Sequence, residues 1–206
     1  WLASSREWTI GDPGQTTNKY PYDGLRMEKA WNFGASMTKE FTFDYRSGVL
    51  VLDYFYTLFT DRTIVDLDAS PQRLLVYNLD GSSFASTFQA ELQYEVFKRV
   101  DAKVAYKIQD SQITYKEVGL RKQIFTPQSR FFFNISYVSS TATYKGHWRF
   151  NLTAHHTGEQ RIPDTDSNPV AFQLATHSPG YWLFNGQITR VFNKNTEVYL
   201  GVENIS

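Results

Sequence analysis

Two long runs of alternating apolar and polar residues, separated by a short polar break, constrain the fold of this chain most. Over residues 84–96 the apolar side chains fall at even-numbered positions. The same pattern resumes over residues 101–108, after the break at 97–99. Successive side chains of a β-strand point to opposite faces, so each run predicts a strand with one apolar and one polar face. The pair therefore predicts a β-hairpin. Residues 82–96 alternate over 15 positions, whereas strands of globular proteins centre on about 5–6 residues.

The charges on the polar parity suggest a register for this hairpin. Glu91 and Glu95 precede the break, and Lys103 and Lys107 follow it. Unlike charges directly opposite one another stabilise a strand pair. We therefore expect Glu95 to lie opposite Lys103, and Glu91 opposite Lys107.

The rest of the chain repeats the alternating pattern. Further strands are predicted over residues 31–43, 49–67, 129–138, 147–155, 182–192 and 197–203, the second strand of the hairpin runs to about residue 116, and residues 1–10 read as the end of another strand. The connections are long over residues 11–26, 68–81, 117–127 and 158–180, and short over 44–48, 97–100, 139–146 and 193–195. In an antiparallel meander every second connection lies at the same end, so one end carries tight turns and the other carries large loops.

This sorting of loops, together with strands that are apolar on one face, is typical of outer-membrane barrels. Lipid offers the backbone no hydrogen-bond partner, so spanning strands must pair with one another. We predict an all-β fold, an antiparallel transmembrane β-barrel. A soluble β-sandwich also alternates, and it is the alternative. Strands this long with loops this regularly sorted favour the barrel.

Composition excludes several classes of protein. The chain has 206 residues with 21 basic and 21 acidic side chains, no cysteine and 17% aromatic residues. Balanced charge without a basic block argues against a nucleic-acid partner. The lack of cysteine excludes a disulfide scaffold and a thiolate metal site. No apolar run approaches the roughly 18 residues of a membrane helix.

Three segments resemble motifs of a known family. Residues 26–34 (RMEKAWNFG) resemble the Pro-Glu-x-x-x-Asn-x-Gly segment of TonB-dependent outer-membrane receptors. Residues 53–66 (DYFYTLFTDRTIVD) are similar to their tyrosine-rich strand, and residues 199–205 (YLGVENI) to their Gly-x-x-Asn-Ile/Leu motif. Met27 stands where the family usually has proline, and Arg62 stands where it usually has glutamine. Receptors of Bacteroidetes-like bacteria resemble the chain most.

The resemblance implies a 22-stranded barrel that is filled by an N-terminal plug and preceded by a TonB-binding segment. Residues 1–206 are then expected to be part of a single barrel domain and to supply about nine strands from its C-terminal part. The plug and the last strand are expected to lie outside the sequence.

The resemblance also implies function and partners. It implies a receptor in the bacterial outer membrane, integral to the lipid and with the long loops extracellular. Such receptors import a scarce nutrient, such as a ferric siderophore, cobalamin or a similar chelate, with energy from TonB, and a surface lipoprotein is a further partner. A passive porin is the first alternative function, and a soluble carbohydrate-binding β-domain is the second.

Chemical motifs are sparse, and neither a catalytic site nor a cofactor is expected. The candidate ligand-binding residues, on the lumen face or in the outer loops, are Glu91, Lys107, Arg130, Arg161, Asp164 and Asp166. The strand charges are more simply lumen-face residues that pair with each other.

Two patterns in the sequence resemble metal sites, but neither has the ligands and spacing that a metal ion requires. The residues from Asp164 match the start of an EF-hand loop, but Pro169 replaces the required glycine and Ala175 the bidentate glutamate, so a polar surface loop is preferred. His147 and His155 share a strand face but lie about 26 Å apart. No metal site is therefore expected.

Overall fold

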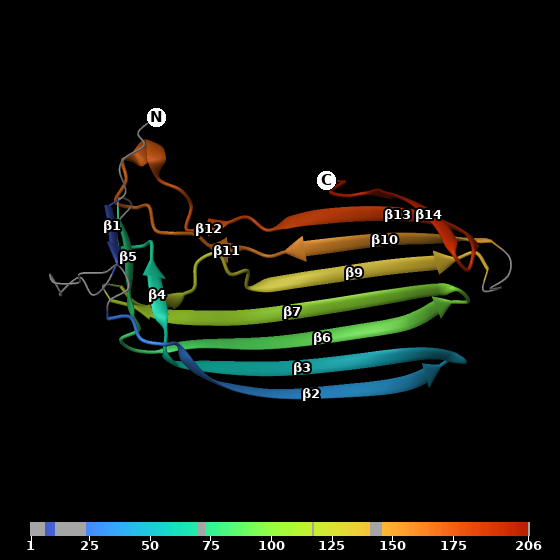
Figure 1. The fold of residues 1–206 in the computed structure, drawn as a ribbon, viewed down its shortest axis with the longest axis horizontal. Helices are drawn as coiled ribbons and strands as arrows, with labels where there is room; N and C mark the ends of the chain where they lie inside the picture. The colour runs from blue at the N-terminus through green and yellow to red at the C-terminus, as the bar shows by residue number, and fades with distance from the viewer. Residues whose placement is uncertain (1–6, 11–23, 70–72, 117, 141–145, 206) are drawn as a thin grey trace.

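Long antiparallel strands make up most of the chain (Figure 1). The structure, a computed structural model, describes residues 7–10, 24–69, 73–116, 118–140 and 146–205. In these residues nine strands form the main sheet: β2 (Lys29–Phe43), β3 (Arg46–Asp61), β6 (Ser83–Phe97), β7 (Val100–Tyr115), β8 (Gly119–Lys122), β9 (Ser129–Val138), β10 (His147–Thr157), β13 (Tyr181–Asn193) and β14 (Thr196–Val202). Eight of them follow one another as a meander from β2 to β14, and β8 pairs beside β7. The predicted all-β, antiparallel fold is confirmed.

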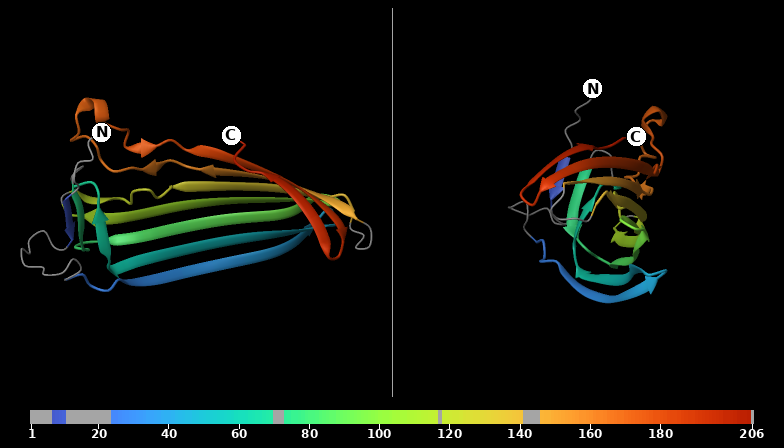
Figure 2. Two further views of the ribbon diagram at one scale, coloured as in Figure 1. Left: turned by 45° about the horizontal axis from the view of Figure 1, so that its top comes forward. Right: turned by 90° about the vertical axis from the view of Figure 1, so that its right-hand side faces the viewer.

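The sheet is curved like a section of a barrel wall. The right-hand view of Figure 2 shows the strands following an arc, with β2 and β14 at its two ends. In the part of the chain that the structure describes, each of these two strands pairs on one side only. The curvature follows from the right-handed twist that neighbouring strands impose on one another.

The register separates apolar side chains from polar ones, as the alternation predicts. Leu50 lies opposite Leu92, and Leu92 lies opposite Val104. One residue further along β6, Gln93 lies opposite Lys103 on the other face. The apolar face is open to its surroundings, because Leu92 and Phe88 are each 41% exposed. A soluble sandwich would cover such a face with a second sheet, whereas lipid covers it in a membrane barrel.

Aromatic side chains stand at both ends of the apolar face. Trp31 (64% exposed) and Trp182 (45%) lie near the end that carries the long loops, which we call the loop end. Trp148 (43%) and Phe97 (64%) lie near the opposite end, the turn end. Aromatic side chains prefer the two membrane–water interfaces, where they flank the apolar band of a barrel. Their positions therefore mark the two borders of that band.

The connections at the turn end are tight. Two residues, Asp44 and Tyr45, join β2 to β3, and both have positive φ angles, 48° and 58°. Two residues also join β6 to β7, and β13 to β14. Turns of this length with positive φ angles match the twist of the flanking strands. The predicted short turns over 44–48, 97–100 and 193–195 are confirmed as short.

The register predicted for the β6–β7 hairpin is wrong by two residues. Glu95 lies opposite Asp101, and Glu91 lies opposite Ala105. The two-residue turn with a positive φ at Arg99 and an irregularity between Glu95 and Phe97 set the pairing. The backbone N–H of Arg99 donates to the Glu95 carboxylate at 3.1 Å. Glu95 therefore closes the turn and does not pair with Lys103.

A second, small sheet departs from the predictions. It contains β1 (Glu7–Ile10), β5 (Arg73–Asn78) and β4 (Thr63–Asp66), with β1 parallel to β5. Glu7–Ile10 is therefore not the end of a strand of the main sheet, and the strand predicted over 49–67 is interrupted at Arg62. The predicted loop 68–81 likewise contains a strand. Of the long connection predicted over residues 11–26, residues 11–23 lie outside the described part of the chain.

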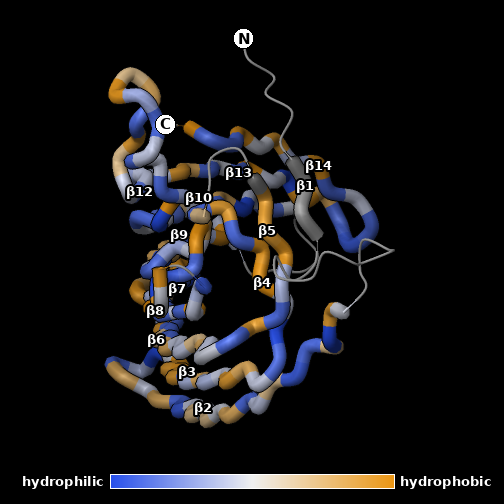
Figure 3. The backbone as a smooth tube through the Cα atoms, turned by 90° about the vertical axis from the view of Figure 1, so that its left-hand side faces the viewer, coloured by the Kyte–Doolittle hydropathy of each residue, from blue (hydrophilic) through white to orange (hydrophobic). Residues whose placement is uncertain are grey.

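The small sheet lies inside the curve of the main sheet, at the loop end (Figures 1 and 3). Ile64, Tyr77 and Leu79 form a buried cluster with Ile113 and Tyr115 of β7. Ile113 shares its parity with the lysines of the polar face of β7. The polar face is therefore the concave one, and the small sheet covers its loop end.

The remaining short elements belong to the long connection that joins β10 to β13 along the chain. They are β11 (Gln160–Arg161), a 3-10 turn (Val170–Phe172) and β12 (His177–Ser178), of which β11 and β12 pair. Among the described residues, no helix has the length and apolar character needed to cross a membrane.

The assignment of faces yields a prediction for Leu92 and Gln93, which are adjacent on β6. We expect Leu92→Arg to lower the free energy of unfolding from a bilayer by about 2–4 kcal/mol, because the charge enters the lipid-facing band. Gln93→Arg, on the concave face, should cost far less. Denaturant titration of the full-length barrel refolded in vesicles measures both, and equal penalties would contradict the assignment.

Candidate functional site

A polar hollow lies on the concave face near the middle of the sheet. Strands β6, β7, β9, β10 and β13 line it, and it contains the charged side chains Glu91, Lys103, Lys107 and Arg130. Ala105 lies between the two lysines on β7 and is small, so the longer side chains around it enclose a recess. The hollow brings together three of the candidate residues predicted from the sequence: Glu91, Lys107 and Arg130.

Only part of the positive charge in the hollow is neutralised. The Nζ of Lys103 lies 2.6 Å from the Glu91 carboxylate. This ion pair is diagonal, because Glu91 lies opposite Ala105, two residues along β7 from Lys103. Lys107 lies directly opposite Arg130. Like charges placed opposite one another destabilise a strand pair, so these two cations do not stabilise each other.

An aromatic wall borders the recess on the β9–β10 side. The rings of Phe132 and His155 meet edge to face with their centroids 5.0 Å apart. His156 points to the opposite face, where its ring lies 4.8 Å from that of Trp182. The recess therefore combines cations with an apolar surface.

The second group of candidate residues lies at the loop end. The Arg161 guanidinium lies 2.6 Å from the Asp68 carboxylate, and these side chains are only 11% and 1% exposed. Arg161 also donates to the backbone carbonyl of Lys122 at 3.1 Å. The backbone N–H of Asp164 donates to the other oxygen of Asp68 at 2.9 Å. Asp68 and Arg161 thus join three of the long connections into one unit, which we call the loop lock.

Asp66 organises the interior of the small sheet. Its carboxylate accepts hydrogen bonds from the Tyr77 hydroxyl at 2.8 Å and from the backbone N–H groups of Asp68 and Ala69 at 2.9 and 3.1 Å. Burial raises the pKa of the Tyr77 phenol, and its hydrogen bond to Asp66 raises that pKa further. Tyr77 therefore stays protonated and keeps its donor role.

The two remaining predicted candidates, Asp164 and Asp166, lie beside the loop lock. The backbone N–H of Asp166 donates to the Asp164 carboxylate at 3.0 Å, and Arg121 lies 3.4 Å from it. These contacts hold the pKa of Asp164 below its ordinary value. Asp166 itself is exposed. Among the described residues, no group of three or more His, Asp or Glu side chains is arranged to hold a metal ion.

The structure therefore divides the predicted residues between two places. Glu91, Lys107 and Arg130 line the hollow, while Arg161 and Asp164 belong to the loop end. The sequence analysis missed Asp68, whose partner Arg161 is 93 positions away. A contact of that separation leaves no periodic signal in the sequence.

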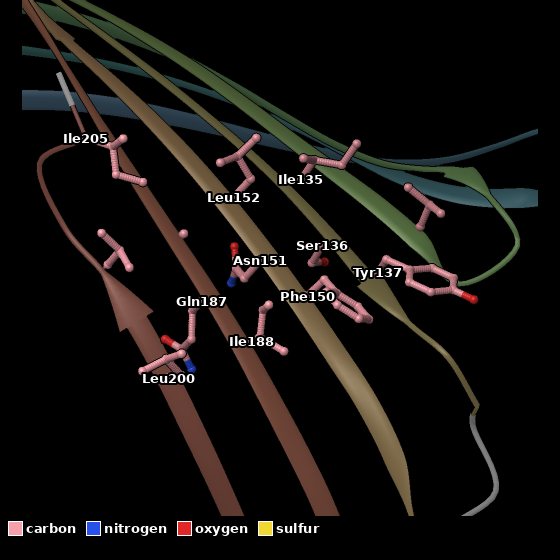
Figure 4. Close-up of a pocket in the computed structure, with 13 residues that line it drawn as sticks. Ile135, Ser136, Tyr137, Phe150, Asn151, Leu152, Gln187, Ile188, Leu200 and Ile205 are labelled. Carbon is pink, nitrogen blue, oxygen red and sulfur yellow. The ribbon is translucent and has the colours of Figure 1, made fainter.

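A separate apolar groove lies on the other face, over β9, β10, β13 and β14 (Figure 4). Ile135, Leu152, Ile188 and Leu200 line it, and they all belong to the apolar parity of their strands. Gly186 lies opposite Leu152 and leaves the groove open there. This groove suits hydrocarbon chains, so we do not assign polar cargo to it.

Comparison with known proteins gave one family. A family model described as TonB dependent receptor-like, beta-barrel matches residues 2–205. Neither the curated proteins nor the solved structures provided a match.

The loop lock yields a prediction for Asp68. Asp68→Asn leaves the buried Arg161 without its counter-charge, and breaking a buried pair costs about 3–5 kcal/mol. We expect faster amide hydrogen exchange and faster proteolysis over residues 158–164. The matched control is Glu197→Gln, which removes the exposed ion pair with Arg149 and should cost no more than about 1 kcal/mol. Unchanged exchange in Asp68→Asn would show that the lock does not hold the loops.

Proposed function

Because the chain belongs to the TonB-dependent receptor-like β-barrel family, we propose that it forms part of the wall of an energised importer. The family consists of receptors and transporters of the bacterial outer membrane, and it is not a class of enzymes. The cargo we propose is a scarce nutrient such as a ferric siderophore, cobalamin or a similar chelate, with energy from the TonB system. The observation that carries the proposal is the family match over residues 2–205.

The two faces of the sheet support this proposal. The convex face presents exposed apolar side chains such as Leu92 and Phe150, as a surface in contact with lipid would. The concave face presents Glu91, Lys103 and Lys107, as a hydrated interior would. Unpaired strand edges are not tolerated in lipid, so β2 and β14 need further strands beside them. We therefore propose that residues 1–206 belong to a single, larger barrel domain.

The need for an energy source follows from the size of such a barrel. Diameter grows with strand number, and a wide barrel leaves an aqueous channel unless a plug fills it. The outer membrane has neither ATP nor an ion gradient that could move a plug. Force must therefore come from an inner-membrane partner across the periplasm, and we propose TonB for this role, acting through a part of the receptor outside residues 1–206. A surface lipoprotein is a further proposed partner.

We also propose an orientation in the membrane. The loop end carries the long connections and the small sheet, and the turn end carries the two-residue turns. Outer-membrane barrels have short turns on the periplasmic side and longer loops outside. The loop end is therefore assigned to the cell exterior.

Two other functions compete with import. A passive porin shares the barrel but needs no TonB. A soluble carbohydrate-binding domain would bury one sheet face, and the exposed apolar face disfavours it, since Trp31 is 64% exposed and Leu200 72%. The porin is thus the alternative that an experiment must separate from energised import.

Uptake measurements test the role of TonB. Cells expressing the full-length receptor should take up labelled ferric siderophore or cobalamin when that compound is the cargo. In an otherwise identical strain without TonB, uptake should fall to background while binding at the cell surface is retained. Continued uptake in that strain would support the porin.

Cysteine labelling tests the orientation, and the lack of native cysteine makes it specific within this chain. We expect an impermeant thiol reagent on intact cells to label Ser167→Cys, in the long connection, and not Lys98→Cys, in the turn between β6 and β7. Permeabilised cells should show labelling of both variants. The opposite pattern on intact cells would reverse the assigned orientation.

A further inference from the structure

Lys107 and Arg130 face the interior of the curved sheet without an acidic partner. They lie directly opposite one another on β7 and β9. Within the described residues, neither side chain forms an ion pair. Like charges directly opposite one another lower the stability of a strand pair, so this pair does not help to hold the sheet together.

Glu91 and Asp53 have partners of their own. Glu91 is held by Lys103 at 2.6 Å. Asp53 lies opposite Gln89, which lies opposite Lys107, so about 9–10 Å of sheet separates Asp53 from Lys107. Asp53 accepts a hydrogen bond from the Ser36 hydroxyl at 2.5 Å. Glu159 lies diagonally across from Arg130, because Thr157 pairs with Arg130 and Gln160 with Pro127, and among the described residues it forms no ion pair with either cation. The cation pair is therefore not neutralised by its own sheet.

The surroundings of the pair form a row of hydrogen-bond donors. Gln89 lies opposite Lys107, and Thr157 lies opposite Arg130. These four side chains, on four neighbouring strands, cover about 14 Å across the concave face. The recess over Ala105 lies beside the row, and Phe132 lines it. A ligand with separated anionic groups and an apolar portion matches this combination.

We propose that Lys107 and Arg130 form a binding site for a small, multiply charged anion that carries carboxylate or phosphate groups. Arg130 supplies a planar guanidinium that can bind such a group with two parallel hydrogen bonds. Lys107 supplies a compact second charge, and Gln89 and Thr157 supply neutral donors. The inference rests on the proposed import function, since it names the chemical class of cargo that this interior face receives.

Isothermal titration of the purified full-length receptor in detergent, without TonB, tests the site. The probes are citrate and inorganic pyrophosphate, with a neutral trisaccharide as the uncharged comparison. We expect at least one of the two anions to bind and the trisaccharide not to bind. Binding of citrate alone identifies carboxylate as the recognised group, and binding of pyrophosphate alone identifies phosphate.

The variants are Lys107→Gln and Arg130→Gln, with Lys98→Gln as the control. Each of the first two should weaken anion binding about tenfold to a hundredfold, because each removes a charge-assisted hydrogen bond. Lys98→Gln removes the same charge from the turn of the same hairpin, about 25 Å along the sheet from Lys107, and should leave the affinity unchanged within twofold. Heat-modifiable mobility on gels confirms that each variant forms its barrel.

Two results would overturn the inference. One is that the wild-type receptor binds neither anion. The partner of Lys107 and Arg130 would then be an acidic side chain in another part of the receptor. The other is anion binding that the Lys107→Gln/Arg130→Gln double variant retains. Because the titration needs no TonB, its failure is separate from that of the proposed function: uptake in a strain without TonB would refute energised import and leave the anion site intact.

Discussion

Hydrocarbon offers no hydrogen-bond partner to a backbone amide or carbonyl, and this constraint accounts for the architecture of the chain. A strand that crosses a bilayer must pair on both sides, so long antiparallel strands in a continuous meander are the economical solution. Strands β3 and β7, with 16 residues each, meet this demand at a length that a soluble sheet seldom needs. The same constraint leaves β2 and β14 in need of neighbours.

Because the backbone groups pair with one another, the side chains on the two faces of the sheet can differ in polarity. The convex face presents Leu92 and its apolar neighbours, while the concave face presents charged groups such as Lys103 and Lys107. The loop end adds a third environment, because the small sheet and the Asp68–Arg161 ion pair fold a compact, buried unit over the concave side. The chain therefore presents three kinds of surface: an apolar convex face, a polar concave face and a buried unit at the loop end.

The outline of the fold could be predicted from the sequence because alternation is a local property. The strand predicted over 31–43 corresponds to β2, Lys29–Phe43, and that over 129–138 to β9, Ser129–Val138. The register of the β6–β7 hairpin could not be predicted in the same way. Charge pairing favoured Glu91 opposite Lys107, but the geometry of the two-residue turn placed Ala105 there. Backbone conformation at the turn outweighed the pairing of exposed charges, which are worth little.

The sequence by itself therefore determined the long strands of the main sheet, the polarity of their two faces and the sorting of short and long connections, since each depends on neighbours within a few residues. Only the tertiary structure decided which distant residues meet. It placed Lys107 opposite Arg130 on neighbouring strands and paired Asp68 with Arg161, which lies 93 positions away. It also folded Glu7–Ile10 and Arg73–Asn78 into a separate sheet, because the burial of Tyr77 and Ile113 in one cluster depends on three-dimensional packing, which no local pattern encodes.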